Sequence, residues 1–162
     1  MQEDRNRRKV ILRKLDGQIF KGFLDEIPEW SGADNLSILT ITGESLEIPK
    51  SEIKALFFVR RFTGNKDHAE VRFFDTHPQI DGLWIRVTFK DGEVLEGIVA
   101  NNFDFFVQDG FYIKPPDPNT NNRLVYILKS SLQDLTILGV QYTKKTLAEF
   151  VTTKSIEARA SG

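Results

Sequence analysis

Few side chains in this sequence are of the types that carry out catalysis or bind metal ions. The chain has no cysteine, which excludes disulfides, thiolate metal sites and cysteine nucleophiles. Its two histidines, His68 and His77, are nine residues apart, a spacing unlike that of a metal pair on one helix face or one strand. The sequence contains neither a glycine-rich phosphate loop nor the spacing of a Ser/His/Asp triad. We therefore predict a protein that is not an enzyme and holds no metal ion or cofactor.

Aromatic residues are the most concentrated potential binding groups. The segment 101–112, NNFDFFVQDGFY, contains five aromatic side chains, and a small core cannot bury all of them. Two interpretations stay open, internal packing or an exposed patch for a protein partner. The neighbouring loop 114–123, KPPDPNTNNR, is either an ordered turn or a polar ledge beside that patch. Trp30, in the matching loop of the first half, is either a lid over the core or a ligand platform. The candidate partner-binding residues are Phe103, Phe105, Phe106, Phe111, Tyr112, Asn121, Asn122, Arg123 and Trp30.

Positive charge is concentrated at the start of the chain. Residues 1–14 include six Arg or Lys and two acidic residues, whereas the whole chain has a formal net charge of −1. That net charge creates no global field that would attract nucleic acid or anionic lipid. A basic arm with Arg5, Arg7 and Arg8 is nevertheless a candidate for phosphate contacts, and a solvated run of charges is the alternative.

One local pattern occurs twice along the chain. An Asp-Gly step at 16–17 recurs at 91–92, and the glycine that follows each step, Gly22 and Gly97, keeps the same distance from it. Alternating β-branched and aromatic residues precede the Asp-Gly step, which is typical of a β-hairpin turn. The later glycines predict a sharp bend or bulge in the second strand of each hairpin.

A second stretch also repeats, at a slightly larger separation. LEIPKSEIKALFFV (46–59) aligns without gaps to VYILKSSLQDLTIL (125–138). Each stretch is typical of a strand, one helical turn and a further strand, so each half has five short strands. A duplicated unit of roughly 55 residues is the favoured explanation, and chance similarity between small β-units is the alternative. We predict an all-β fold of two tandem five-stranded barrels of the SH3-like or Sm-like type.

The repeat also predicts how the chain is organised. Small open barrels leave strand edges exposed, and a duplicated unit can close them by pairing its two copies. The apolar runs ALFFV (55–59) and LTIL (135–138) are expected near that contact, with the protein a monomer or at most a dimer. The expected parts are a first barrel with a basic arm (1–60), a connector (61–80), a second barrel (81–139) and a tail with one short helix (140–162).

The composition is that of a globular protein. With 40% hydrophobic and 28% charged residues, the chain can form a core, and its 13 phenylalanines supply large apolar side chains. No segment approaches the run of about 20 apolar residues that a membrane-spanning helix needs. We expect a cytoplasmic protein, because the lack of cysteine also fits a reducing compartment.

The first half of each repeat resembles the first motif of Sm-like RNA-binding proteins. The shared features are an alternating strand, Asp-Gly, a second strand ending in glycine, and ADNLSIL at 33–39. The resemblance implies that Asp34 and Asn35 help to hold a base, and RNA is therefore an alternative partner. These two residues are adjacent here, which departs from the family's spacing. The second Sm motif is also altered, since Pro49-Lys50 stands near the place of its Arg-Gly step.

A broader resemblance covers about residues 8–139. The two Asp-Gly-x4-Gly repeats, ALFFVRRF (55–62) and PPDPNTNN (115–122) are similar to an uncharacterised bacterial domain family. This resemblance implies a signalling-associated accessory domain with no assigned chemistry, and hence an adaptor that binds proteins. The basic arm and DNLS (34–37) also resemble motifs of PilZ cyclic-dinucleotide receptors, a remote alternative in which Thr40 replaces the closing glycine.

Overall fold

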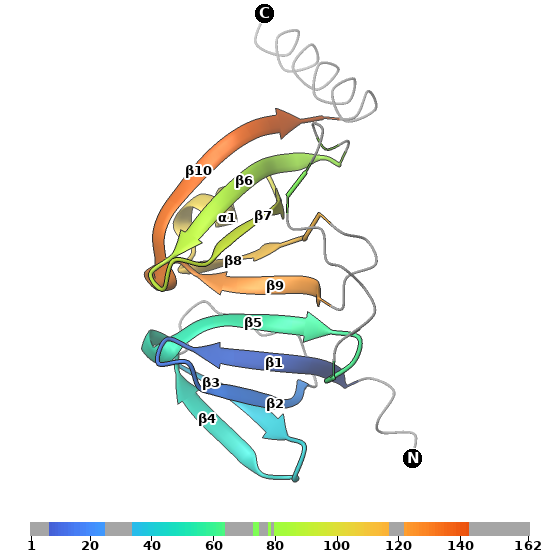
Figure 1. The fold of residues 1–162 in the computed structure, drawn as a ribbon, viewed down its shortest axis with the longest axis vertical. Helices are drawn as coiled ribbons and strands as arrows, with labels where there is room; N and C mark the ends of the chain where they lie inside the picture. The colour runs from blue at the N-terminus through green and yellow to red at the C-terminus, as the bar shows by residue number, and fades with distance from the viewer. Residues whose placement is uncertain are drawn as a thin grey trace, which may run out of the picture.

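Most of the residues that the structure describes lie in β-strands, so the all-β fold class expected from the sequence is confirmed (Figure 1). The computed structural model describes residues 7–24, 34–63, 73–74, 78, 80–116 and 122–142. The strands of the first half are β1 (Arg8–Lys14), β2 (Ile19–Leu24), β3 (Asn35–Thr40), β4 (Ser45–Pro49) and β5 (Ile53–Val59). Those of the second half are β6 (Gly82–Phe89), β7 (Val94–Val99), β8 (Gly110–Ile113), β9 (Asn122–Leu128) and β10 (Leu132–Gln141). Short helices are η2 (Lys50–Glu52), α1 (Phe103–Val107) and η3 (Lys129–Ser131).

The two predicted Asp-Gly hairpins are confirmed. They connect β1 to β2 and β6 to β7, and their glycines Gly17 and Gly92 have φ values of 92° and 91°. Only glycine adopts this left-handed conformation without strain. In each turn the aspartate side chain, Asp16 or Asp91, accepts a hydrogen bond from the amide two residues later, at 2.9 and 3.0 Å. The local sequence therefore fixes both turns.

Hydrogen bonding joins the strands into two sheets. The larger has seven strands in the order β4-β3-β2-β1-β5-β9-β8, and the smaller has the order β10-β6-β7. A single bridge between Ile98 and Lys114 connects β7 to the end of β8. The prediction of two separate five-stranded barrels needs correction, because neither sheet closes and the larger one contains strands of both halves. The physical reason is that β5 pairs with β1 on one edge and with β9 on the other.

The ladders of the two halves match residue for residue. Pairing of β1 with β2 starts at Arg8 and Leu24, and pairing of β6 with β7 starts at the two equivalent positions of the second repeat. In the first half the ladder between β1 and β5 skips Lys54. In the second half the ladder between β6 and β10 skips Gln133, which aligns with Lys54 in the repeat. Both skipped residues form β-bulges, which bend a strand and increase its twist.

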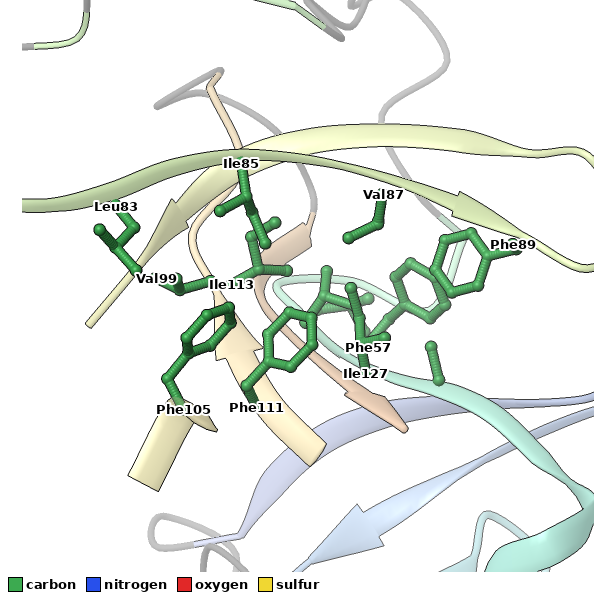
Figure 2. Packing of buried hydrophobic residues seen from close by; sticks show 13 residues of the cluster. Phe57, Leu83, Ile85, Val87, Phe89, Val99, Phe105, Phe111, Ile113 and Ile127 are labelled. Carbon is green, nitrogen blue, oxygen red and sulfur yellow. The ribbon is translucent and has the colours of Figure 1, made fainter. Parts of the chain in front are cut away.

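Strands β5 and β9 contribute to the cores of both halves. Because side chains alternate along a strand, one face of β5 (Ala55, Phe57 and Val59) packs in the second-half core. Leu56 and Phe58 on its other face pack in the first-half core. Figure 2 shows Phe57 reaching the side chains of the second half. The predicted contact between the halves at ALFFV (55–59) is thus confirmed. The same prediction is wrong for LTIL (135–138), which belongs to β10, an edge strand far from that contact.

Some described elements lie outside the two expected units. Strand β10 continues to Gln141, two residues beyond the expected end of the second unit. From the connector, Phe62 packs edge-to-face on Phe23 at 5.4 Å, and Phe74 packs on Trp84 at 5.9 Å. The predicted helix in the tail falls outside the described residues. No helix in the described part of the chain is long and apolar enough to cross a membrane.

An ion-pair cluster connects the two halves at the hairpin end of β6. Lys54 of β5 is buried, and its Nζ donates to Asp91 Oδ2 at 2.6 Å and to Glu93 Oε2. The same ammonium group lies 4.6 Å from the centre of the Phe89 ring. The hydrogen bond from Lys54 is the main cause that lowers the pKa of Asp91 below its ordinary value of 3.8.

Replacing Lys54 with methionine is expected to weaken the acid dependence of stability. A carboxylate with a lowered pKa stabilises the fold above its unfolded pKa, and this contribution is lost as the pH falls through the folded pKa. Urea unfolding of Lys54→Met should therefore show a smaller decline between about pH 5 and pH 3 than the wild type shows. The control is Lys90→Met, which removes a neighbouring exposed lysine and should leave the decline unchanged. Equal declines in Lys54→Met and wild type would contradict this role of Lys54.

Candidate functional site

Helix α1 carries three of the five aromatic side chains of the segment 101–112 that the sequence singled out. It begins after Asn102, whose side-chain oxygen accepts a hydrogen bond from the Phe105 amide at 3.2 Å, a typical N-cap. In the middle of the helix, the Phe105 carbonyl oxygen accepts a hydrogen bond from Lys129 Nζ at 2.6 Å. Two polar side chains from different parts of the sequence therefore hold this five-residue helix between β7 and β8.

Two of the predicted partner-binding residues belong to the core. Phe105 and Phe111 are buried, and their rings meet edge-to-face at 5.1 Å (Figure 2). Both point toward Ile85 of β6 in the interior of the second half. The prediction that they form part of an exposed surface is wrong, because Phe105 anchors α1 and Phe111 faces inward from β8.

Tyr112 lies at the junction between the halves. Its ring is 6.1 Å from that of Phe58 in β5 and 4.7 Å from that of Tyr126 in β9. It is partly buried and packs against the first-half core, although it belongs to the second half. Tyr112 therefore contributes to internal packing.

Three exposed side chains on α1 form a compact apolar surface, here called the α1 ridge. Phe103 is 76% exposed, Phe106 58% and Val107 52%. The ring of Phe106 contacts that of the buried Phe105 edge-to-face at 5.1 Å, so the ridge rests directly on the core. Val107 was not among the predicted residues. The spacing of three and four residues from Phe103 is the signal that identifies it, because such positions share one face of a helix.

Several other predicted residues cannot be assigned to this surface. Trp30, Asn121 and Arg5 lie outside the described residues, as does most of the loop 115–122. Asn122 is described through its backbone, which pairs with Val59 across β9 and β5. Arg123 follows it in the same strand.

The residues of the RNA alternative lie at one end of the first-half sheet. Arg8 begins β1 and Asn35 begins β3, and no described hydrogen bond or ion pair joins these two residues. Asn35 Nδ2 donates to the Glu47 carboxylate at 3.3 Å, and the Asp34 carbonyl oxygen accepts from the Lys50 amide at 2.8 Å. The Glu47 carboxylate thus places negative charge beside the predicted base-binding amide, and Arg7 precedes β1.

Comparison with known proteins assigns the chain to a family. Residues 6–139 match the model of a family of unknown function, DUF6982, and the match spans all of β1 to β9 and most of β10. The chain belongs to this family. No curated protein and no solved structure gives a significant match to the chain. The DUF6982 match extends over both halves and over α1, so it treats them as one unit.

One carboxylate in this DUF6982 chain is deeply buried outside the ridge. Glu96 of β7 accepts hydrogen bonds from Trp84 Nε1 at 2.9 Å and from Arg86 at 2.8 and 3.2 Å. Both oxygens of Glu96 therefore have donors, and this buried carboxylate pairs with the half-exposed Arg86 on the outer side of the hairpin. Phe73 lies with its ring centre 5.8 Å from the Arg86 guanidinium. This arrangement fits a structural role.

A pocket in this DUF6982 chain surrounds the ion-pair cluster of the fold. It has a volume of about 230 Å³ and is lined by Leu15, Lys54, Phe89, Lys90, Asp91 and Ser131. Lys54 and Asp91 bind each other there, so they stabilise the contact between the halves. Across the described residues, no group of three or more His, Asp or Glu side chains is arranged to hold a metal ion. The α1 ridge is therefore the strongest candidate site.

Proposed function

We propose that the chain is a non-enzymatic adaptor module that binds a protein through the α1 ridge. The observation that carries this proposal is the exposure of Phe103 and Phe106 on helix α1. The remaining phenylalanine of the helix, Phe105, is anchored in the core. Large aromatic side chains on a rigid support lose little conformational entropy on binding, and such residues dominate many protein interfaces. Covering each ring would contribute roughly 1.5–3 kcal/mol to binding.

We further propose that the chain consists of two copies of one curled, Sm-like unit. The strand orders β5-β1-β2-β3-β4 and β10-β6-β7-β8-β9 correspond, with the bridge at Ile98 taking the place of the ladder between β2 and β3. The matching registers and the two bulges support the same conclusion. On this view α1 is what distinguishes the second copy, where it lies between β7 and β8 in a segment as long as the one between β2 and β3.

RNA binding by the first copy is the second candidate, and its support is the Sm-like strand order. The surroundings of Asn35 favour the protein partner instead. The side-chain amide of Asn35 already donates a hydrogen bond to Glu47. A carboxylate beside a base-binding group also repels the phosphates of a nucleic acid. The formal net charge of −1 adds no compensating attraction.

The ridge is tested by affinity capture from an extract of the native cell, with and without nuclease. Replacing Phe103 and Phe106 together with serine should abolish capture of the partner or weaken it about tenfold or more, because both exposed rings are lost. The fold should persist, since neither side chain is buried. Nuclease should have no effect on capture by the wild type.

The matched control replaces two exposed isoleucines of the first half, Ile19 and Ile41, with serine. This variant removes similar apolar surface away from α1 and should capture the partner like the wild type. Capture that nuclease abolishes, and that falls steeply with salt, would favour RNA binding. Capture that the ridge variant retains in full would overturn the proposed site.

A further inference from the structure

The outer edge of β10 has no described strand beside it, whereas the same edge of β5, its counterpart in the first half, pairs with β9. Strand β10 is the last strand of the smaller sheet, and no described strand pairs with its second edge. Ile137, which lies opposite the buried Ile85 on the core side of the sheet, is still 46% exposed. Val140 lies opposite the buried Leu83 on the same side and is similarly exposed. Inward-facing residues are thus left partly uncovered along this edge.

The corresponding residues of β5 are covered completely. Leu56 and Phe58, which align with Leu135 and Ile137 in the repeat, are buried. The difference is the presence of β9, which pairs with the second edge of β5. The outer faces of β8 and β9 cover the first-half core with four apolar side chains, Tyr112, Leu124, Tyr126 and Leu128.

A second copy of the chain does not offer the same cover to β10. The strand that corresponds to β9 is β4, and it is also the edge strand of its sheet. At the positions of the four apolar residues, the first half has Ser37, Ser45, Glu47 and Pro49, all of them exposed. A copy of β4 placed on β10 would therefore bring the Glu47 carboxylate and the Ser45 hydroxyl group against Leu135 and Ile137.

The other face of β10 specifies the chemistry of the missing strand. Where β5 has Ala55 and Phe57, which pack into the second-half core, β10 has the exposed Asp134 and Thr136. A strand that adds to β10 must therefore be apolar on one face only. On its other face, a cation opposite Asp134 and a hydroxyl opposite Thr136 would complement the edge.

We propose that the free edge of β10 binds an extended strand of a partner protein, as β9 adds to β5 within the chain. The incoming strand is apolar at alternate positions, covers Leu135 and Ile137 with that face, and carries a basic residue opposite Asp134. Backbone hydrogen bonds to the open edge supply affinity, and the alternation supplies specificity. The inference uses none of the residues of the α1 ridge, so it does not depend on the proposed role of the ridge.

The probe is a peptide derived from β9 itself, NRLTYRLKSS, which is the sequence 122–131 with Val125→Thr and Ile127→Arg. In the register of β5 and β9, position 127 lies opposite Ala55, so the arginine would face Asp134 and the threonine would face Thr136. Labelled peptide should bind the full chain saturably below about 1 mM in fluorescence anisotropy. Amide exchange should show new protection in β10 and none in β4.

Two comparisons make the result specific. Ile137→Glu should weaken binding about tenfold, whereas Ile41→Glu, at an exposed site in the first half, should leave it unchanged. The ridge variant that replaces Phe103 and Phe106 should bind the peptide like the wild type, which separates this test from that of the proposed function.

Three outcomes would overturn the inference. One is the absence of saturable binding up to about 1 mM, and another is protection that appears away from β10. The third is equal binding of GESLEIPKSE, the sequence 43–52 that contains β4, together with concentration-dependent self-association in sedimentation. That result would identify a second copy of the chain as the occupant of the edge.

Discussion

Alanine at Gly97 is expected to lower the free energy of unfolding by about 3 kcal/mol. A Cβ built on Gly97 lies 2.4 Å from Ile113 Cγ1 and 2.5 Å from the Lys114 carbonyl oxygen. The second contact is with backbone, so rotation of a side chain cannot relieve it, and β7 and β8 would have to separate. Urea unfolding followed by circular dichroism measures the change.

The matching glycine of the first half provides an independent repeat of the experiment. A Cβ on Gly22 lies 2.4 Å from the Leu39 carbonyl oxygen, so Gly22→Ala should be as damaging as Gly97→Ala. The control is Gly92→Ala, because a Cβ added at Gly92 meets no atom within 4 Å. Only the positive φ of this residue opposes alanine, and the expected cost is about 1 kcal/mol. A loss below about 1 kcal/mol for Gly97→Ala would show that the strands separate without difficulty and that close approach is not the role of this glycine.

The hairpins and most strands were predictable because their signals are local. An Asp-Gly step between alternating apolar residues specifies a turn whatever lies elsewhere in the chain. Gly22 and Gly97 were correctly placed in the second strand of each hairpin, but their role as points of close approach to the next strand was not. That contact involves a residue beyond the hairpin, Leu39 or Lys114, whose pairing no local pattern reveals.

The seven-stranded sheet that joins the two halves was harder to predict, because it depends on which strand pairs with each strand edge. The runs ALFFV and LTIL were both expected near the contact between the halves, and only the first prediction was correct. What distinguishes them is polarity on one face, since Asp134 and Thr136 replace Ala55 and Phe57. The preference of native proteins for charge on open edges was the physical clue.

The aromatic site was predictable as a region and not residue by residue. Residues 103–112 combine a helix, whose exposed residues are three and four apart, with the start of a strand, in which neighbouring side chains face opposite sides. Asn102 at the N-cap marks where the helix begins, and this signal was available in the sequence. Because the segment was treated as a single aromatic cluster, the core residues Phe105 and Phe111 were grouped with the exposed Phe103 and Phe106.

Replacing Tyr126 with alanine is expected to destabilise both halves of the molecule together, by about 3–5 kcal/mol. Tyr126 belongs to β9 in the second half, yet its ring is buried in the first-half core, where it faces Leu56 across the ladder. The cavity left by alanine would thus open at the junction between the halves. One cooperative transition is expected in urea, at a lower midpoint, with increased amide exchange in β1 and β5 as well as in β9.

The phenol group of Tyr126 allows a separate test of its burial. Burial raises the pKa of Tyr126 above its ordinary value of 10.0, so the unfolded chain loses this proton at a lower pH than the folded chain. Stability should consequently fall as the pH rises above about 10, and Tyr126→Phe should reduce that decline while preserving the ring.

Tyr142→Ala, at an exposed tyrosine just after β10, is the control and should cost less than about 1 kcal/mol. Two separate unfolding transitions, with only one of them shifted in Tyr126→Ala, would mean that the halves fold independently. The shared strands β5 and β9 argue against that result, because removing either half would expose apolar residues of the other, such as Phe58 or Ile127, along an open strand edge.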